Sequence, residues 1–189
     1  MNDIDRIKLE VINNRLKYNE LFELYIRYLK IRQRMMNKIP SYRNDYKYYV
    51  NSRNTNCYAY AFRFDLPDYF DEAFKYFDSI GFYFEPGCFS NIFDINSESK
   101  LLEALYSDLN ILGIKYSDKI DSDYLYKVAV FQEYDFLYDK NGVPDFHFCR
   151  LNNNNLWSCK NGIRGKIEKI NTPKACFTYK LVKILDINK

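Results

Sequence analysis

Two residues far apart in the sequence could do chemistry together, Cys57 and His147. Cys57 follows the polar segment Asn54-Thr55-Asn56 and opens the apolar run Cys-Tyr-Ala-Tyr-Ala-Phe. His147 is the single histidine of the chain and stands in the segment Asp-Phe-His-Phe-Cys-Arg. A thiol and an imidazole are the minimum parts of a cysteine nucleophile and its general base.

The segment before Cys57 predicts the start of a helix. Asn54 or Thr55 can cap it by accepting a hydrogen bond from a free backbone N–H one turn on. Unpaired N–H groups and the helix dipole in the first turn favour negative charge and therefore the reactive thiolate. The first-turn N–H groups can also face a developing oxyanion, with the side-chain amide of Asn51, Asn54 or Asn56 as a second donor. The alternative is an inert cysteine buried in an apolar helix.

Alternation around His147 predicts a strand. Positions 145, 147 and 149 share one face, and the two phenylalanines at 146 and 148 share the other. The run Asn152 to Asn155 favours a turn, and Leu156 to Lys160 then returns as the second strand of a hairpin. Folding about Asn153 and Asn154 brings His147 near position 159 or 160, where a residue could orient the imidazole. The alternative is a hydrogen-bonded structural histidine.

These segments resemble a group of small bacterial and viral proteins. The resemblance is carried by Asn-Cys-Tyr-Ala-Tyr-Ala at residues 56–61, Pro86-Gly87, Asp-Phe-His-Phe-x-Arg at 145–150 and Leu-Trp-Ser-x-Lys-x-Gly at 156–162. The group belongs with papain-like cysteine peptidases and amidases of the broad NlpC and CHAP type. The resemblance covers residues 50 to 165, and its specific parts are the cysteine and histidine segments.

The resemblance implies a nucleophilic cysteine at the start of the central helix, matched by Cys57, and a base on the following sheet, matched by His147. The third member of such sites is a His, Asn or Gln on the next strand. The resembling proteins read Trp-Ser-His-Lys where this chain has Cys159 in the histidine position. Cys159 therefore stands in the orienting position. The alternatives are that Ser158, Asn155 or a backbone carbonyl orients the ring, or that the chain is impaired as an enzyme.

These residues lead to the expectation of a thiol hydrolase: a peptidase, isopeptidase or amidase that acts through an acyl-enzyme. The implied substrate is a peptide, an isopeptide or a peptidoglycan-like amide, and transfer to an amine is equally compatible. Asp145 could act on His147 electrostatically from the same strand face, although a solvated carboxylate is the simpler interpretation. Cys88, after Pro86-Gly87, is a minor alternative nucleophile without a helix start before it.

The remaining pattern predicts an α+β fold, with a papain-like core of one central helix on an antiparallel sheet. A helical extension over residues 1–40 precedes the catalytic-type domain at 41–189. Within this extension, residues 3–38 are predicted to form one helix, capped by Asn2 or Asp3. Further helices are expected at 69–77 and 97–112, the latter ending at Gly113, and further strands at 126–133 and 177–187.

Composition excludes several classes of site. Five widely spaced cysteines without a Cys-x-x-Cys pair, and a single histidine, argue against structural zinc, so no metal and no cofactor is expected. The start of the chain has no secretory pattern, and no segment approaches a membrane-spanning length. We therefore expect a cytoplasmic protein, in its own cell or a host cell, with no membrane partner.

Two other classes of function stay open. The first is a non-catalytic interaction module on a decayed papain-like fold, because Cys159 stands in the orienting position instead of the usual His, Asn or Gln. The second is a nucleic-acid binder, because residues 1–43 hold ten Lys or Arg against five Asp or Glu, a net charge of +5. The whole chain carries only +3, which argues against a nucleic-acid partner. A solvated face, or a surface for a protein partner, explains the basic N-terminal helix more simply.

Overall fold

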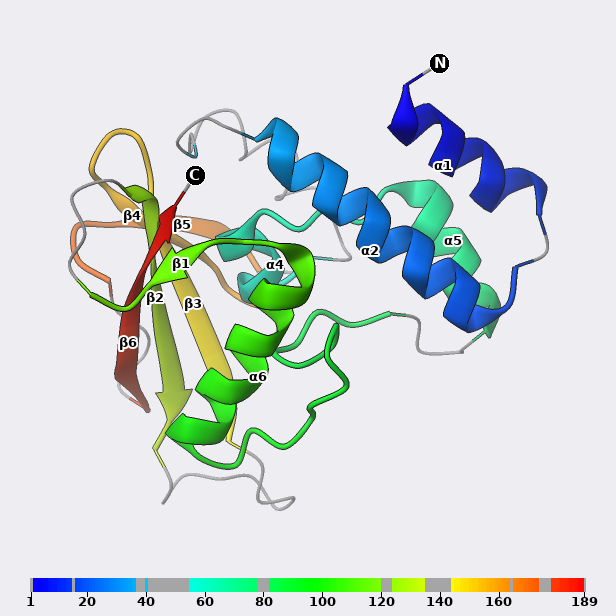
Figure 1. Cartoon of the computed structure of the whole chain (residues 1–189). Coiled ribbons are helices and arrows are strands. Elements are labelled where there is room, and N and C mark those ends of the chain that lie inside the picture. The colour runs from blue at the N-terminus through cyan, green and yellow to red at the C-terminus, as the bar shows by residue number, and fades with distance from the viewer. Residues whose placement is uncertain are drawn as a thin grey trace.

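The computed structural model describes residues 2–14, 16–36, 40, 55–77, 82–119, 124–134, 144–163, 165–173 and 178–188. Over these residues the fold is α+β, as expected, with five helices and one open antiparallel sheet of six strands (Figure 1). The helices are α1 (Asp3–Asn13), α2 (Tyr18–Met35), α4 (Cys57–Phe62), α5 (Asp68–Phe77) and α6 (Glu98–Leu112). The strands are β1 (Tyr116–Ser117), β2 (Tyr124–Glu133), β3 (Phe146–Leu151), β4 (Trp157–Lys160), β5 (Ile167–Ile170) and β6 (Tyr179–Asn188). Their order in the sheet is β1-β6-β2-β3-β4-β5.

The prediction of one helix over residues 3–38 is wrong, because the segment forms two helices. The side chain of Asn2 caps α1 by accepting a hydrogen bond from the backbone of Asp5 at 2.9 Å, as expected. Asn14 then takes an extended conformation that ends α1. Lys17 starts α2, and its backbone N–H donates to Glu20 at 2.7 Å. Asparagine competes for backbone hydrogen bonds and favours such boundaries, and the break lets α1 fold back onto α2.

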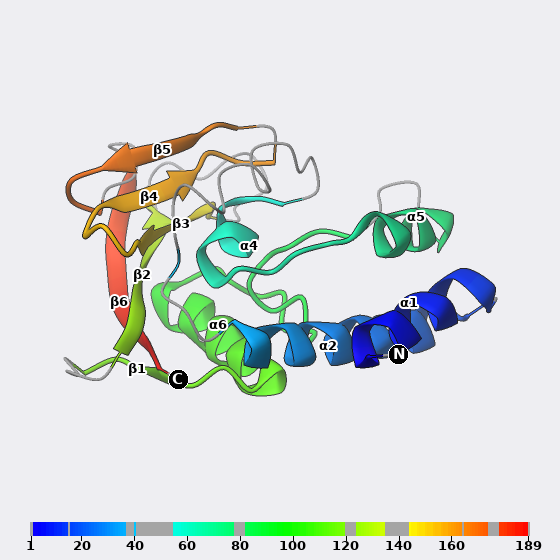
Figure 2. The same ribbon diagram turned by 90° about the horizontal axis from the view of Figure 1, so that it is seen from above.

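The two N-terminal helices share one hydrophobic core with the rest of the molecule. Their buried stripe (Ile7, Val11, Leu21, Leu24, Tyr25, Tyr28, Leu29) belongs to the same cluster as buried residues of α4, α5, α6 and the sheet. Figures 1 and 2 show the helices gathered on one side of the sheet, with α4 between strands β3–β4 and the α1–α2 hairpin. The helices α1 and α2 therefore pack into the same core as the other described helices and the sheet.

The sheet separates this core from a smaller one. Val128, Val130 and Phe148 face the helices, whereas the alternate residues Ala129, Phe131 and Cys149 belong to a second cluster with Trp157 and Cys159. The split confirms the predicted alternation around His147, since successive side chains of a strand point to opposite faces.

The β3–β4 hairpin is confirmed, but its register differs by one residue from the expected one. Cys149 lies opposite Cys159 and Leu151 opposite Trp157, so the turn is centred on Asn154. Asn155 adopts a left-handed conformation with φ of 58°, which adds a residue to the turn. The residue on β4 closest to His147 on the same face is consequently Cys159.

The other expected elements are found close to their predicted bounds. Ser97 caps α6 by accepting from the backbone of Lys100, and Gly113 ends it with φ of 70°. The short strands β1 and β5 were not expected from the sequence. The segment Asp139-Lys140-Asn141-Gly142, whose residue types predict a turn, lies outside the described residues.

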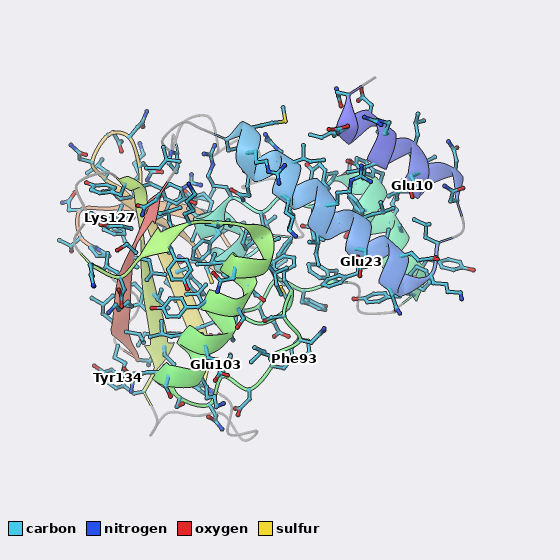
Figure 3. All side chains as sticks on the ribbon, viewed as in Figure 1. Glu10, Glu23, Phe93, Glu103, Lys127 and Tyr134 are labelled. Atoms are coloured by element: carbon cyan, nitrogen blue, oxygen red, sulfur yellow. The ribbon has the colours of Figure 1, made fainter. Side chains whose placement is uncertain are left out.

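The outer faces of the helices include charged side chains. Glu10, Glu23 and Glu103 are exposed on α1, α2 and α6, while the interior between α6 and the sheet is filled with side chains (Figure 3). Among the described residues, the helices are too short or too polar for any of them to cross a lipid bilayer.

Candidate active site

Cys57 is the first residue of α4, as expected, but the capping residue is different. The helix is capped by Asn56, whose Oδ1 accepts from the backbone N–H of Ala59 at 3.1 Å. Neither Asn54 nor Thr55 is the cap, because the helix begins one residue later than such a cap would require. The helix is short, with six residues. The Cys57 thiol donates to the carbonyl of Phe146 on β3 at 4.0 Å.

Contacts at both ends hold α4 in place. At its start, the Asn56 amide donates to the carbonyl of Phe84. At its end, Gln33 of α2 donates to the carbonyl of Phe62 at 2.9 Å. The buried guanidinium of Arg150 donates to the carbonyl of Tyr60 at 3.0 Å, and stacks on the ring of the same residue at 3.9 Å. The position of Cys57 is thus fixed by α2, by β3 and by the segment before Pro86.

The His147 ring lines the same cavity as the thiols of Cys57 and Cys159, and one of its nitrogen atoms lies within 4.8 Å of the Cys159 sulfur. Burial by itself lowers the pKa of the ring. The hydrogen bonds to Cys159 and Cys57 and the negative charge of their thiolates outweigh burial and raise the pKa of His147 to about 10. The two residues that the sequence singled out therefore line one cavity, and the neighbouring sulfur atoms favour a protonated ring.

Cys159 carries the second thiol beside the ring, and the pKa of this thiol is strongly lowered. A hydrogen bond with Cys149 and pairing with His147 lower the pKa of the Cys159 thiol to about 5, against burial and the charge of Glu168, which raise it. Cys149 is opposite Cys159 on the neighbouring strand and is fully buried. Cys159 thus contacts the imidazole from the position predicted for an orienting residue, in the form of an anion.

The alternatives to Cys159 are used elsewhere. The Ser158 hydroxyl points to the other face of β4, where it bonds to the hydroxyl of Tyr60 at 2.6 Å and accepts from Asn152 at 2.8 Å. Asn155 is exposed in the hairpin turn. The carboxylate of Asp145 accepts from its neighbouring backbone N–H at 2.8 Å and from the hydroxyl of Tyr179, so it serves the turn rather than the ring.

Lys160 adds a positive charge near the nucleophile. Its ammonium group donates to the carbonyls of Gly162 at 2.8 Å and Ile163 at 2.5 Å. Burial lowers the pKa of Lys160 to about 8, and negative charge on Cys57 acts in the opposite direction.

The expected oxyanion donors are only partly within the described residues. Asn51 and Asn54 lie outside them. The Asn56 amide N–H₂ donates to the carbonyl of Phe84, so this side chain positions the start of α4 and is not an oxyanion donor. The intrahelical ladder of α4 starts with the bond from Tyr60 to the carbonyl of Asn56 at 3.0 Å, which leaves the N–H groups of Cys57 and Tyr58 in the first turn outside the ladder.

Cys88 is in a different environment. Its buried thiol lies 4.0 Å from the carboxylate of Asp108. Burial raises the pKa of this thiol well above its usual value, and the charge of Asp108 raises it further. Cys88 is therefore an inert thiol rather than a nucleophile.

A cavity of about 790 Å³ opens beside Cys57 and His147. Cys57, His147 and Cys159 line it, although Cys57 itself is only 5% exposed. The rest of the lining comes from the start of α4, the start of β3, the β4–β5 connection and the ends of β5 and β6 (Asn56, Asp145, Phe146, Asn161, Gly162, Ile163, Glu168, Ile170, Tyr179). Its volume suits a small peptide or amide rather than a folded protein surface.

Sequence reasoning missed two participants, Cys149 and Lys160. The strand alternation had placed Cys149 on the face of His147, and Lys160 is part of the motif at 156–162. The missing information was the hairpin register, which brings Cys149 against Cys159. As a result, ligand atoms of His147, Cys149 and Cys159 lie within 4.8 Å of one another, a grouping that a count of histidines could not reveal.

Comparisons with protein-family models, with curated proteins and with solved structures give no match to this chain. The chemistry of the site is therefore argued from its own geometry.

Proposed function

We propose that this protein is a cysteine hydrolase of amide bonds, with Cys57 as nucleophile, His147 as general base and acid, and Cys159 as the residue that orients the ring. A papain-like arrangement is part of the proposal, since a cysteine opens a helix that packs on the strands carrying the histidine and the orienting residue.

The observation that carries the proposal is the meeting of the Cys57 thiol and the His147 ring at the wall of one cavity. The two residues come from segments 90 positions apart. A buried thiol without chemistry needs neither an imidazole partner nor a cavity, and Cys88 illustrates that simpler environment. A nucleophile and base within hydrogen-bonding reach, with a third group on the base, is the general signature of nucleophilic catalysis.

The reaction follows from these positions. In the reactive form, the His147 imidazolium holds the proton of Cys57, Cys159 has lost its own proton to solvent, and the Cys57 sulfur attacks the carbonyl carbon of the amide. The tetrahedral oxyanion receives hydrogen bonds from first-turn N–H groups of α4. The imidazolium then gives its proton to the leaving nitrogen as the C–N bond breaks, which leaves a thioester on Cys57. Water, deprotonated by the ring, cleaves the thioester and restores the thiol.

Cys159 takes the part that a carboxylate or amide takes in related sites. As a thiolate it pairs with the imidazolium and holds the ring in one orientation. The substrate class is a peptide, isopeptide or peptidoglycan-like amide, since the cavity holds a few residues and its lining mixes aromatic, amide and carboxylate groups.

A non-catalytic interaction module on the same fold is the competing function. The low exposure of Cys57 favours it, because a nucleophile must reach its substrate. It predicts a Cys57 that reacts with small electrophiles no faster than a buried thiol.

Alkylation by iodoacetamide at neutral pH, with each modified cysteine located by peptide mass spectrometry, separates the two functions. We expect Cys57 to react quickly in the native protein, and His147→Gln to slow that reaction at least about a hundredfold, within the usual range for loss of a general base. Cys88→Ser is the matched control and should leave the rate at Cys57 unchanged, because Cys88 contacts Asp108 instead.

Turnover is then measured on small fluorogenic peptide and isopeptide amides and on peptidoglycan fragments, with Cys57→Ala as the inactive reference. A Cys57 that is alkylated no faster than Cys88 would overturn the proposal, whatever the substrate panel gives. A reactive Cys57 without turnover of any of these amides would remove the assigned substrate class.

A further inference from the structure

Three metal-ligating side chains meet beside the cavity, from two neighbouring strands. His147 and Cys149 are two residues apart on β3 and so share a face, and Cys159 lies opposite Cys149 on β4. One ligand atom from each residue lies within 4.8 Å of the other two. In the proposed reaction His147 and Cys159 act directly, whereas Cys149, which is fully buried, acts only through its hydrogen bond with Cys159.

We propose that His147, Cys149 and Cys159 form a binding site for a thiophilic divalent cation of the zinc class, with its fourth coordination position open to the cavity. Two thiolates and one imidazole are ligands that zinc prefers over the hard oxygen ligands of magnesium and calcium. Three protein ligands with one open position are typical of exchangeable or reactive zinc sites rather than of closed structural ones.

The geometry needs only a small adjustment to hold the ion. Bonds of about 2.3 Å to sulfur and about 2.0 Å to nitrogen place tetrahedral ligand atoms roughly 3.5–3.8 Å apart. The observed separations, up to 4.8 Å, can close to this range through side-chain rotation. Cys149 and Cys159 lie directly opposite each other on the antiparallel strands β3 and β4, where the Cα atoms of neighbouring strands approach each other closely.

The surroundings suit a cation. Two thiolates cancel the charge of a divalent ion, so the buried site stays close to neutral and avoids a large desolvation cost. Glu168 lies opposite Cys159 on β5 and adds negative potential from the cavity wall. The ammonium group of Lys160 is directed to the carbonyls of Gly162 and Ile163.

Metal binding should inhibit the proposed reaction of Cys57. A ring nitrogen lone pair given to the ion is no longer available to Cys57, and Cys159 can no longer orient a free ring. Any proton on the two thiols is released to solvent as the metal–sulfur bonds form. This inhibitory consequence rests on the proposed function, whereas binding of the ion does not.

Cobalt(II) titration of the reduced, metal-free protein tests the binding itself, with a phosphine reductant that does not chelate metals. We expect one equivalent to give thiolate-to-cobalt charge-transfer absorption together with the strong visible bands of tetrahedral cobalt. Zinc should displace it. Cys149→Ser should weaken zinc binding at least about a hundredfold, measured by competition with a chromophoric chelator.

A second measurement separates this inference from the proposed function. The iodoacetamide rate at Cys57 is compared with and without one equivalent of zinc for each variant. In the native protein we expect at least a tenfold decrease that a chelator reverses. In Cys149→Ser the ratio of the two rates should be close to one. Tetrahedral cobalt bands with an unreactive Cys57 would refute the proposed function and leave the metal site standing.

Loss of the fold in a variant is checked by circular dichroism. If Cys149→Ser does not fold, His147→Gln removes a different, partly exposed ligand and carries the same expectation for cobalt and zinc. Cys88→Ser is the control thiol and should keep the native cobalt spectrum. Absence of charge-transfer bands in the native protein, or native zinc affinity in both ligand variants, would overturn the inference.

Discussion

At the scale of single residues, the site depends on how one imidazole is shared between two thiols. His147 lines the cavity together with Cys57 and Cys159, and its pKa rises to about 10 because negative charge on the neighbouring sulfur atoms favours the protonated ring. Of the two cysteines, Cys57 stands at the first turn of a helix, where N–H groups can receive an oxyanion. In the proposed reaction this difference divides the roles: Cys57 attacks, and Cys159 orients the ring.

This division predicts the effects of changing Cys159. Cys159→Ala removes the anion beside the ring, so the rate of Cys57 alkylation at neutral pH should fall about tenfold or more. Cys159→His places at this position the residue found in the resembling proteins, and should retain more of the rate than alanine does. Rates are measured by peptide mass spectrometry. Equal rates in the native protein and Cys159→Ala would show that the ring needs no third residue.

The residues that could be predicted from the sequence are those whose role is local. Cys57 after a polar turn, and His147 on an alternating strand, are recognisable from their neighbours alone. Cys149 and Lys160 were not, because their roles depend on the hairpin register, and a single left-handed residue at Asn155 changes which residues face each other. The cap was also misplaced by sequence, since Asn54, Thr55 and Asn56 are all acceptable capping residues.

At the scale of elements, a buried carboxylate on α6 fixes the segment that follows Pro86. Asp108 accepts hydrogen bonds from the backbone of Gly87 at 2.7 Å, Phe89 at 3.1 Å and Ser90 at 2.8 Å, and from the hydroxyl of Tyr58 at 3.0 Å. Tyr58 follows Cys57 on α4. One side chain therefore connects α6, the Pro-Gly turn and the helix that begins with Cys57.

Replacing this carboxylate should be costly. In Asp108→Asn an amide N–H₂ faces backbone N–H donors, so several buried groups lose their acceptor. We expect a loss of about 3 kcal/mol in the free energy of unfolding and a fall of about 10 °C in the melting temperature. Asp118→Asn is the matched control: this carboxylate is about half exposed and pairs with Lys183 at 3.3 Å, so its loss should cost under about 0.5 kcal/mol. Urea unfolding monitored by circular dichroism measures both, and similar values for the two variants would contradict this role.

Elements with both a start and a stop signal were predicted well, and those without were not. The helix α6 has a serine cap, a leucine stripe and a terminal glycine, and its bounds follow from these. The break between α1 and α2 has only asparagines and a lysine to mark it, and the apolar period continues on both sides. The strand β5 has four residues and two exposed charges, so only its pairing with β4 identifies it.

At the scale of the whole molecule, the N-terminal helices complete the core and hold α4. The hydroxyl of Tyr25 donates to the carbonyl of Asp65 at 2.8 Å, and that of Tyr28 donates to its carboxylate at 2.6 Å, just after the catalytic helix. Arg32 pairs with the same carboxylate at 3.4 Å. The basic character of residues 1–43 thus includes at least one charge with a structural partner, which reduces the case for a nucleic-acid surface.

This connection predicts that a chain starting at residue 41 cannot fold by itself. Removal of α1 and α2 would expose the aromatic residues that pack on Tyr25, among them Phe70, Phe74 and Phe82. It would also leave Asp65 buried without its hydroxyl donors. We expect such a chain to lose cooperative thermal unfolding and near-ultraviolet circular dichroism, and to bind hydrophobic dyes.

A shorter deletion provides the graded comparison. Starting the chain at residue 16 removes only α1, whose buried residues are Ile7 and Val11, so the protein should unfold cooperatively at a lower temperature and keep a reactive Cys57. If instead residues 41–189 unfold cooperatively and alkylate at the native rate, the helices are a separable extension, as the sequence alone suggested. Loss of Cys57 reactivity in the longer deletion, together with its retention in the shorter one, would establish α2 as part of the frame that positions the nucleophile.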